Sequence, residues 1–389
     1  MANVSSSNGL DKRPKLRFPG FDEPYRTTHL GEIATLVNRT DPKSNAPIMM
    51  LSAGNGFIMQ SVKYSRDNAG QSLKKYILLK QGELAYNHGA SKAKQFGCCY
   101  ELTEPEARIP YVYHCFKVSD TEYTPFVAAT LNNPKMDKQL KRLVSSSVRM
   151  DGLLNISFDD YMSVSLHLPS FAEQKKIADF LKKLDERITA QEMLVASLKK
   201  YKRGAIAYIL SGKSNEFDVE ATWTEKTLAD LCCEFRSGRN ISAALIHESG
   251  DYPVYGGNGI RGYCDHYSHE GEYVVVGRQG ALCGNVRLIQ GQNYLSEHAI
   301  AVRANENNDT KFLLFLLDFM NLGQYSDQGA QPGLAVNKLL RLKCNVPEKK
   351  TQSKISSFLL TFDRQIAAQE SLLAFLTDQR KAFLQQLFI

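Results

Sequence analysis

A predicted strand in the second half of the chain ends in side chains that can contact nucleic-acid bases. The apolar run at residues 273–276 predicts a buried strand, and Arg278 and Gln279 follow it between two glycines. Arginine can form paired hydrogen bonds with guanine, and glutamine can form them with adenine. Base contact by Arg278 and Gln279 is therefore one interpretation. An ion pair of Arg278 with Glu297, with the glycines serving a tight β-corner, is the other.

A glycine-rich loop precedes this strand. Residues 252–263 combine aromatic side chains with turn-forming residues, and their glycines let the backbone approach a ligand closely. Asn258 and Arg261 are the side chains of this loop that we expect to contact the ligand.

The first half of the chain has a comparable strand end at residues 86–94, where lysines can contact phosphate groups. The candidate contacts there are Asn87, His88, Lys92 and Lys94. A second basic cluster, at residues 138–149, ends in Arg149, which is a further candidate. This cluster is either a phosphate-binding turn or a solvated helix face with its exit loop.

Motifs for nucleotide or cofactor chemistry are poorly developed. Residues 212–214 match the last three residues of the phosphate-binding loop motif. However, Ala207 occupies the position of the motif's first glycine, and a predicted helix precedes the segment where the motif requires a strand. The glycines around Arg278 lack the spacing and the following helix of a dinucleotide site. Glu173, near a helix start, is better explained by the helix dipole than by a nuclease metal site. We expect no catalytic residue, no metal site and no cofactor bound by this chain.

The composition narrows the class of protein. The 389 residues suffice for two to three domains, and 43% hydrophobic with 23% charged residues is typical of globular proteins. The formal charge of +7 is compatible with a polyanionic partner. Because no run of about 18 uncharged apolar residues and no signal peptide is present, we expect a cytoplasmic protein without a membrane span. The eight cysteines lack a C-x-x-C spacing, which favours reduced thiols over zinc ligands.

The chain contains one internal repeat. The segment that begins at Pro169 aligns without gaps on the segment that begins at Pro347, a shift of 178 residues. Identical pairs in this alignment include Gln174 and Gln352, Asp185 and Asp363, and Gln191 and Gln369, of which the last pair is a polar position in the apolar seam of each copy.

Each copy of the repeat predicts a helix about 55 to 60 Å long, because apolar residues recur at nearly heptad spacing. A helix with one apolar stripe must bury it, so we expect the two helices to pack on each other as a coiled coil. Separate packing of each helix on its own domain is the alternative. The expected contact residues are Ile177, Phe180, Leu184, Ile188, Leu194 and Leu198 in the first helix and Ile355, Phe358, Phe362, Ile366, Leu372 and Leu376 in the second.

The segments before the two helices share framework residues, although their lengths differ. Tyr25, Leu30 and Ile33 correspond to Trp223, Leu228 and Leu231. Gly212 is expected to cap the first helix and to mark a domain boundary. The predicted layout is a tail at 1–20, a domain at 21–168, a long helix at 169–213, a domain at 214–346 and a second long helix at 347–389. The fold class is α+β with a pseudo-two-fold repeat.

Several segments together resemble the specificity subunits of type I restriction-modification systems, the HsdS family. The matching segments are residues 14–21, 166–169, 173–177, 185–192 and 253–259. One departure is that Thr351 precedes Gln352 where the family has a Glu-Gln pair, which predicts weaker capping of the second helix.

The resemblance implies two target-recognition domains, each of which would contact one half of a bipartite target in double-stranded DNA. They would be held apart by two antiparallel helices that dock two modification subunits, and restriction subunits would join the full complex. S-adenosylmethionine, ATP and Mg would be bound by the partner subunits. A coiled-coil adaptor that binds proteins without direct sequence readout remains the alternative. An autonomous DNA-modifying enzyme would require a cofactor loop that we do not find.

Overall fold

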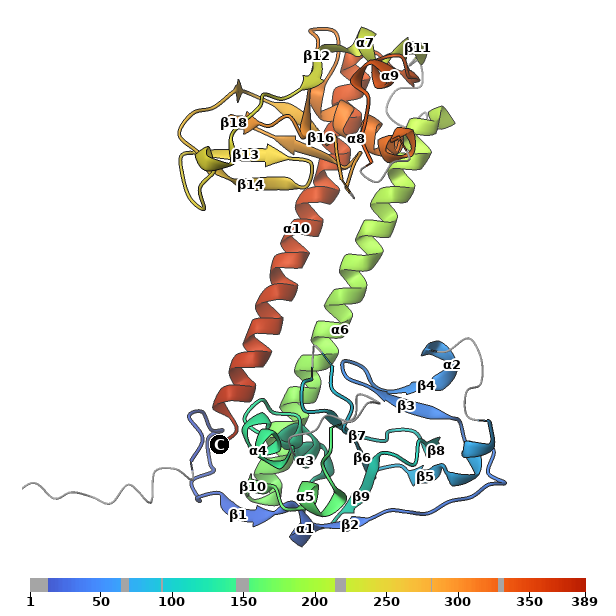
Figure 1. Ribbon diagram of the computed structural model, residues 1–389, viewed down its shortest axis with the longest axis vertical. Coiled ribbons are helices and arrows are strands. Elements are labelled where there is room, and N and C mark those ends of the chain that lie inside the picture. The colour runs from blue at the N-terminus through green and yellow to red at the C-terminus, as the bar shows by residue number, and fades with distance from the viewer. Residues whose placement is uncertain are drawn as a thin grey trace, which may run out of the picture. The chain divides into compact units, whose positions relative to one another are not determined.

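The computed structural model describes residues 13–63, 70–91, 94–144, 154–213, 222–280, 282–327 and 332–389 (Figure 1). The chain forms two compact units. Unit 1 consists of Met1–Ala190 and Leu373–Ile389, and unit 2 consists of Gln191–Leu372.

Unit 1 combines short strands with short helices. In chain order its elements before the first long helix are β1 (Arg26–His29), α1 (Leu30–Ile33), β2 (Ala34–Leu36), β3 (Met49–Ser52), β4 (Gly56–Met59), α2 (Gln60–Lys63), the 3₁₀ helix η1 (Gly70–Lys75), β5 (Ile77–Lys80), β6 (Leu84–Asn87), β7 (Cys98–Glu101), β8 (Glu106–Ile109), β9 (His114–Val118), α3 (Thr124–Leu131), α4 (Asp137–Leu143), α5 (Phe158–Met162) and β10 (Ser165–Leu168).

Unit 2 also combines strands with short helices, and a larger share of its residues lies in strands. Its elements between the long helices are the π-helical turn η2 (Ile209–Lys213), β11 (Thr224–Thr227), α7 (Leu228–Leu231), β12 (Cys232–Ser237), η3 (Ala243–Leu245), β13 (Tyr252–Gly256), β14 (Gly259–Cys264), β15 (His269–Glu270), β16 (Tyr273–Gly277), β17 (Val286–Ile289), β18 (Gln292–Leu295), β19 (Ala299–Ala304), α8 (Thr310–Phe319), η4 (Leu322–Tyr325), α9 (Val336–Leu340) and β20 (Lys343–Val346).

The two units share one framework, as the paired sequence segments predict. Each has a four-stranded antiparallel sheet with equivalent strand order, β2-β9-β6-β7 in unit 1 and β12-β19-β16-β17 in unit 2. Each also has a two-stranded pair at the start of its long helix, β1-β10 and β11-β20. The predicted strand at residues 273–276 is confirmed as β16, whose five residues are all buried.

The two long helices are α6 (Phe171–Tyr208) and α10 (Lys349–Gln386), and they pack on each other inside both units. In unit 1 the rings of Phe180 and Phe383 meet edge to face with centroids 4.9 Å apart. In unit 2 the Gln191 Nε2 donates to Gln369 Oε1 at 2.8 Å, and Lys199 pairs with Glu370 at 2.6 Å. Further along α6, Lys202 pairs with Asp363, which comes before Gln369 in α10, so the pair is antiparallel. The coiled-coil prediction is confirmed, although both helices also pack into the cores of the units.

The seam of this pair differs by one position from the prediction in α6. Leu194 is 44% exposed, whereas Gln191 and Val195 are buried. A heptad seam alternates steps of three and four residues. Gln191 lies in the seam, as the pattern predicts, but the next seam residue is Val195, four residues on, and not Leu194, three residues on. Phe358 in α10 is likewise 39% exposed, next to the buried Leu359.

The ends of both helices are buried in the units. Ile206, Ile209 and Leu210 belong to the core of unit 2, and Leu387 and Phe388 belong to the core of unit 1. Gly212 has a φ of 73°, as expected of a helix-capping glycine. Because each helix contributes to two cores, the units divide within the helices and not at Gly212.

Residues 13–20, assigned to the tail from the sequence, contact the long helices of unit 1. The Arg17 guanidinium donates from Nε to Glu173 Oε1 at 2.8 Å and from Nη2 to Oε2 at 2.7 Å. Leu16 N donates to Gln386 O at 3.0 Å. Glu173 is fully buried, so its carboxylate serves an ion pair with Arg17, a role that the helix-dipole interpretation did not include.

The start of α6 is tied to unit 1 through the side chain of Gln174. Its Oε1 accepts from Tyr123 N at 2.9 Å. Its Nε2 donates to Pro169 O at 3.0 Å and to Glu122 Oε2 at 2.7 Å. One buried glutamine therefore connects the helix to the preceding strand and to the start of α3.

The start of α10 has the same connections through Gln352. Its Oε1 accepts from Asp309 N at 3.0 Å, and its Nε2 donates to Pro347 O at 2.9 Å and to Asn308 Oδ1 at 2.8 Å. The expected weakening at this helix start does not affect the glutamine bonds. It is confined to Thr351, whose buried hydroxyl has no partner among the described residues.

Candidate nucleic-acid interface

The glycine-rich turn between β13 and β14 packs against the end of β16 in unit 2. A Cβ atom at Gly257 would lie 2.6 Å from the carbonyl oxygen of Gln279, and one at Gly277 would lie 2.5 Å from the carbonyl oxygen of Gly257. Only glycine permits backbone segments to approach this closely. The structure therefore brings the loop at 252–263 and the strand end at 277–280 together.

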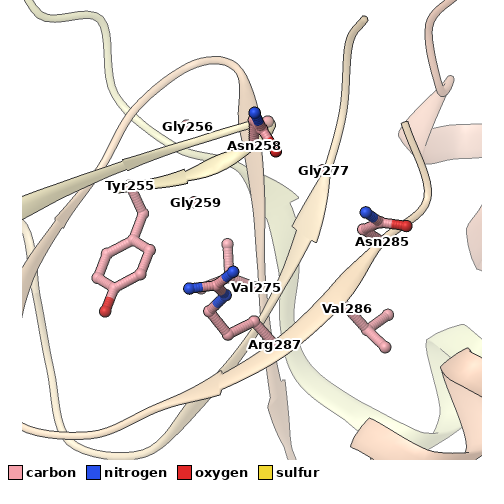
Figure 2. Close-up of a pocket in the computed structure, with 10 residues that line it drawn as sticks. Tyr255, Gly256, Asn258, Gly259, Val275, Gly277, Asn285, Val286 and Arg287 are labelled. Carbon is pink, nitrogen blue, oxygen red and sulfur yellow. The ribbon is translucent and has the colours of Figure 1, made fainter. Parts of the chain in front are cut away.

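A small pocket of about 120 Å³ lies between this turn and the hairpin of β16 and β17 (Figure 2). The backbone of the turn forms one wall. Polar side chains of different kinds complete the lining, and they are Tyr255, Asn258, Asn285 and Arg287. The lining supplies hydrogen-bond donors and acceptors together with an aromatic face, the combination that contacts bases and phosphates in nucleic-acid complexes.

Arg287 was not among the predicted side chains. It lies opposite Val275 in the antiparallel pair of β17 and β16, and a Cβ atom at Gly259 would be 3.2 Å from its Nη2. The side chain is exposed and makes no hydrogen bond or ion pair with any described residue. The sequence contained one indication of Arg287. It interrupts an otherwise apolar run at 286–289, and this run follows the predicted strand at 273–276.

The predicted contacts Asn258 and Arg261 are both exposed at this turn. The Arg261 side chain lies along it, since a Cβ atom at Gly256 would be 2.5 Å from Arg261 Cδ. Within the described part of the chain, neither side chain is engaged in a hydrogen bond. Both side chains are therefore accessible, and their contact with a ligand stays a prediction.

Arg278 and Gln279 are half-buried and belong to a local hydrogen-bond network. Arg278 Nη1 donates to the backbone carbonyl of Glu297 at 3.3 Å, so the alternative of an ion pair with its carboxylate is not what the structure contains. Gln279 Oε1 lies 2.7 Å from His298 Nδ1. His298 Nε2 lies 2.9 Å from Glu297 Oε1.

Two candidates in unit 1 are engaged with the protein's own backbone. Asn87 Oδ1 accepts from Gly89 N at 2.9 Å. His88 is buried, with Nδ1 2.8 Å from Leu154 O and Nε2 2.9 Å from Val112 O. Both ring nitrogens of His88 are therefore occupied, and its prediction as a DNA contact is wrong because the strand end turns this side chain inward.

The Lys94 side chain is also bound within the protein. Its ammonium group donates to Asn132 O at 2.7 Å, where it meets the C-terminal carbonyl groups of α3, and burial lowers its pKa. The phosphate contact predicted for Lys94 would require this bond to break. The candidates Lys92 and Arg149 lie outside the described residues.

In the described ranges, no group of three or more histidine, cysteine, aspartate or glutamate side chains could hold a metal ion. None of the described helices is both long enough and apolar enough to cross a membrane.

Comparison with known proteins connects this geometry to a family. Residues 220–377 match the type I restriction modification DNA specificity domain. The EcoprrI specificity subunit of Escherichia coli is 44% identical over 159 residues, which are 40% of this chain and 38% of that protein. A putative specificity subunit of Haemophilus influenzae is 27% identical over 36% of this chain and 37% of its own length. The chain thus matches about two fifths of the length of these relatives.

Solved structures extend the likeness of the fold to nearly the whole chain. The specificity subunit of the type I system from M. genitalium superposes with a TM-score of 0.68 at 16% identity, over 97% of this chain and 99% of that one. A chain from a study of type I complex assembly gives 0.55 at 16% identity, over 95% and 98%. At such identity these matches show the fold alone, which is the fold of type I specificity subunits over nearly the whole chain. In sequence, residues 220–377 are similar to the DNA specificity domain of type I restriction-modification systems.

Proposed function

We propose that this chain is the DNA-recognition subunit of a type I restriction-modification complex and that each unit contacts one half of a bipartite target in double-stranded DNA. The match of residues 220–377 to the DNA specificity domain carries this proposal, since that range contains the turn at 256–259, Arg278 and Gln279. The equivalent sheet in unit 1 supports a second recognition domain. Residues 21–168 and 214–346 are the proposed domains.

Partner subunits supply the chemistry in this proposal. Specificity subunits are not catalytic, so methylation and cleavage are assigned to modification and restriction subunits, together with S-adenosylmethionine, ATP and Mg. Two modification subunits are proposed to dock on the long helices. Exposed apolar side chains support this docking, since Met193 is 66%, Leu194 44% and Phe375 58% exposed. A cytoplasmic location accompanies the proposal.

Reconstitution tests the DNA-recognition role. The chain is produced with its modification subunits, and methylated bases are mapped in the host genome. We expect one bipartite motif, and no methylation by the chain without its partners. A complex that forms but binds DNA without sequence preference would favour the protein-binding adaptor instead.

A pair of substitutions on α6 tests the docking face. Leu194→Asp places a charge on the exposed apolar surface and is expected to abolish co-elution with the modification subunits in size-exclusion chromatography. Glu192→Lys is the control, because it also changes a charge and because Glu192 is exposed on the side of the helix away from Leu194. Assembly of the Leu194→Asp chain as efficient as that of the control would place the docking surface elsewhere.

A further inference from the structure

The pocket between the β13–β14 turn and the β16–β17 hairpin is lined by polar side chains that the protein itself does not use. The polar side chains of the lining are Tyr255, Asn258, Asn285 and Arg287. None of these side chains forms a hydrogen bond or an ion pair with any residue that the structure describes. The neighbouring side chains of Arg278 and Gln279, in contrast, are bonded to Glu297 O and to His298. The pocket lining is therefore available to a ligand.

Arg287 is the charged side chain of this lining. It reaches from β17 to the turn, where a Cβ atom at Gly259 would lie 3.2 Å from Nη2 and 3.4 Å from both Cζ and Nη1 (Figure 2). Because these three atoms are nearly equidistant from that point, the flat face of the guanidinium lies against the glycine. Its N–H groups point along the plane of the group, so the edge of the guanidinium remains free to donate.

No carboxylate neutralises Arg287 in the ranges that the structure describes. Asp318 and Asp363 border a second hollow beside Arg287. Asp363 pairs there with Lys202, and neither carboxylate lies within ion-pair distance of Arg287. An exposed, unpaired guanidinium attracts anions, and its planar set of donors fits the oxygens of a phosphate group.

The position of Arg287 suits a phosphate group better than a base edge. Base edges lie at the floor of the grooves of DNA, about 8.5 Å deep in the major groove, so a side chain that contacts them must project from the protein. The Arg287 guanidinium instead lies flat on the turn and lines a hollow. Phosphate groups lie on the outside of the duplex and can enter a hollow. The amide groups of Asn258 and Asn285 can donate to the same phosphate oxygens.

We propose that this pocket binds one phosphate group of the DNA backbone and that Arg287 is its charged contact. The inference rests on the proposed function, and it gives Arg287 a role that is independent of base sequence. Phosphate contacts fix the register of a protein on the duplex. The bound phosphate thus sets the position of the half-site relative to Arg278 and Gln279, which follow β16 next to the pocket.

Four variants separate the elements of the proposal. Arg287→Gln removes the charge and keeps a polar side chain. Arg287→Lys keeps the charge and loses the paired donors. Asn258→Asp adds a negative charge to the wall of the pocket. Arg341→Gln is the matched control, since it makes the same change at an exposed arginine of unit 2, at the C-terminal end of α9.

The measurement is equilibrium DNA binding by the chain assembled with its modification subunits, at several salt concentrations. Methylation mapping of the unaltered complex first defines the target, and duplexes with single base changes in each half-site are compared with it. Arg287→Gln is expected to weaken binding to all duplexes by about the same factor, roughly 10- to 150-fold. The slope of log K against log salt should become shallower by about one.

The other variants give graded expectations. Arg287→Lys should keep the salt slope and lose part of the affinity, because the charge remains while the paired donors are lost. Asn258→Asp should weaken binding to all duplexes, because its carboxylate repels the phosphate. Arg341→Gln should change neither affinity nor slope.

The outcomes distinguish this inference from the proposed function. If the unaltered complex shows no sequence preference, the proposed function fails, and the salt slope of Arg287→Gln still tests the phosphate contact. If Arg287→Gln changes the preference at one base position only, Arg287 contacts a base and the phosphate proposal is wrong. It is also wrong if the slope is unchanged, since a misfolded fraction lowers affinity without changing the slope, or if Arg341→Gln lowers the slope equally.

Discussion

The starts of the two long helices have the same hydrogen-bond geometry with different charges. Gln174 and Gln352 bind equivalent backbone atoms, yet the third partner is the carboxylate of Glu122 in unit 1 and the amide of Asn308 in unit 2. The preceding residue is Glu173, paired with Arg17, in one unit and Thr351 in the other. The comparison teaches that the glutamine bonds are common to both helix starts and that the other contacts differ, an ion pair of Glu173 in unit 1 and a bond from Ser353 to the Asp309 carboxylate in unit 2.

The largest expected loss of stability comes from breaking the ion pair of Arg17 with the buried Glu173 in unit 1. Arg17→Ala leaves the fully buried carboxylate of Glu173 with the Tyr25 hydroxyl, at 3.4 Å, as its one partner among the described residues, so unit 1 should lose about 3 to 5 kcal/mol of stability. Hydrogen exchange measured by mass spectrometry on peptides of each unit reports the loss. Protection in unit 2 should stay unchanged.

The matching substitution in unit 2 is Thr351→Val. It removes a buried hydroxyl without a described partner and keeps the shape of the side chain, so it should be neutral or stabilising by up to about 1 kcal/mol. Destabilisation of unit 2 by more than that, in the same exchange experiment, would mean that this hydroxyl has an important partner.

A second contrast concerns the glutamines themselves. Gln174→Glu places a carboxylate against Glu122, where the amide nitrogen now donates at 2.7 Å. Gln352→Glu faces Asn308, whose amide can reverse and donate. We expect the first variant to be less stable than the second by about 1 to 3 kcal/mol, because two buried like charges repel. Urea denaturation of both variants checks the order, and equal losses would contradict it.

Much of the framework could be predicted because its signals are local or repeated. The shift of 178 residues identifies both long helices, and the apolar run at 273–276 identifies β16. The pairing of Arg17 with Glu173 could not be found in this way, since the two residues are 156 positions apart. The Leu194 prediction failed by one position because the seam continues from Gln191 by a step of four residues to Val195, and the apolar pattern alone did not distinguish this step from one of three.

The candidate site was predicted less completely than the framework. Loop composition identified Asn258 and Arg261, which the structure leaves exposed at the turn. The direction of a side chain at a strand end depends on tertiary contacts, and for this reason His88 is buried although its sequence neighbours suggested a binding loop. Arg287 was missed because its strand becomes part of the site only when it pairs with β16.

The smallest expected effect is a difference in acid sensitivity between the units. Burial lowers the pKa of His114 in unit 1, with a further contribution from the neighbouring His88, against the bond to Ile156 O. Burial also lowers the pKa of His269 in unit 2, but the adjacent carboxylate of Glu234 opposes the shift. A histidine with a lowered folded pKa binds fewer protons than in the unfolded chain. Stability is therefore full above about pH 6.5 and is lost as the pH falls below it.

His114→Gln is the variant that measures this effect. The glutamine can still donate to Ile156 O, which accepts from His114 at 2.9 Å, but it does not titrate. The stability of unit 1 should then fall less steeply below about pH 6.5, by at most one bound proton. His269→Gln should change the profile of unit 2 less, because a protonated His269 gains its Glu234 ion pair at 3.3 Å in partial compensation. Hydrogen exchange at pH 5 and pH 8 compares the two, and an unchanged profile for His114→Gln would show that other groups control the acid response of unit 1.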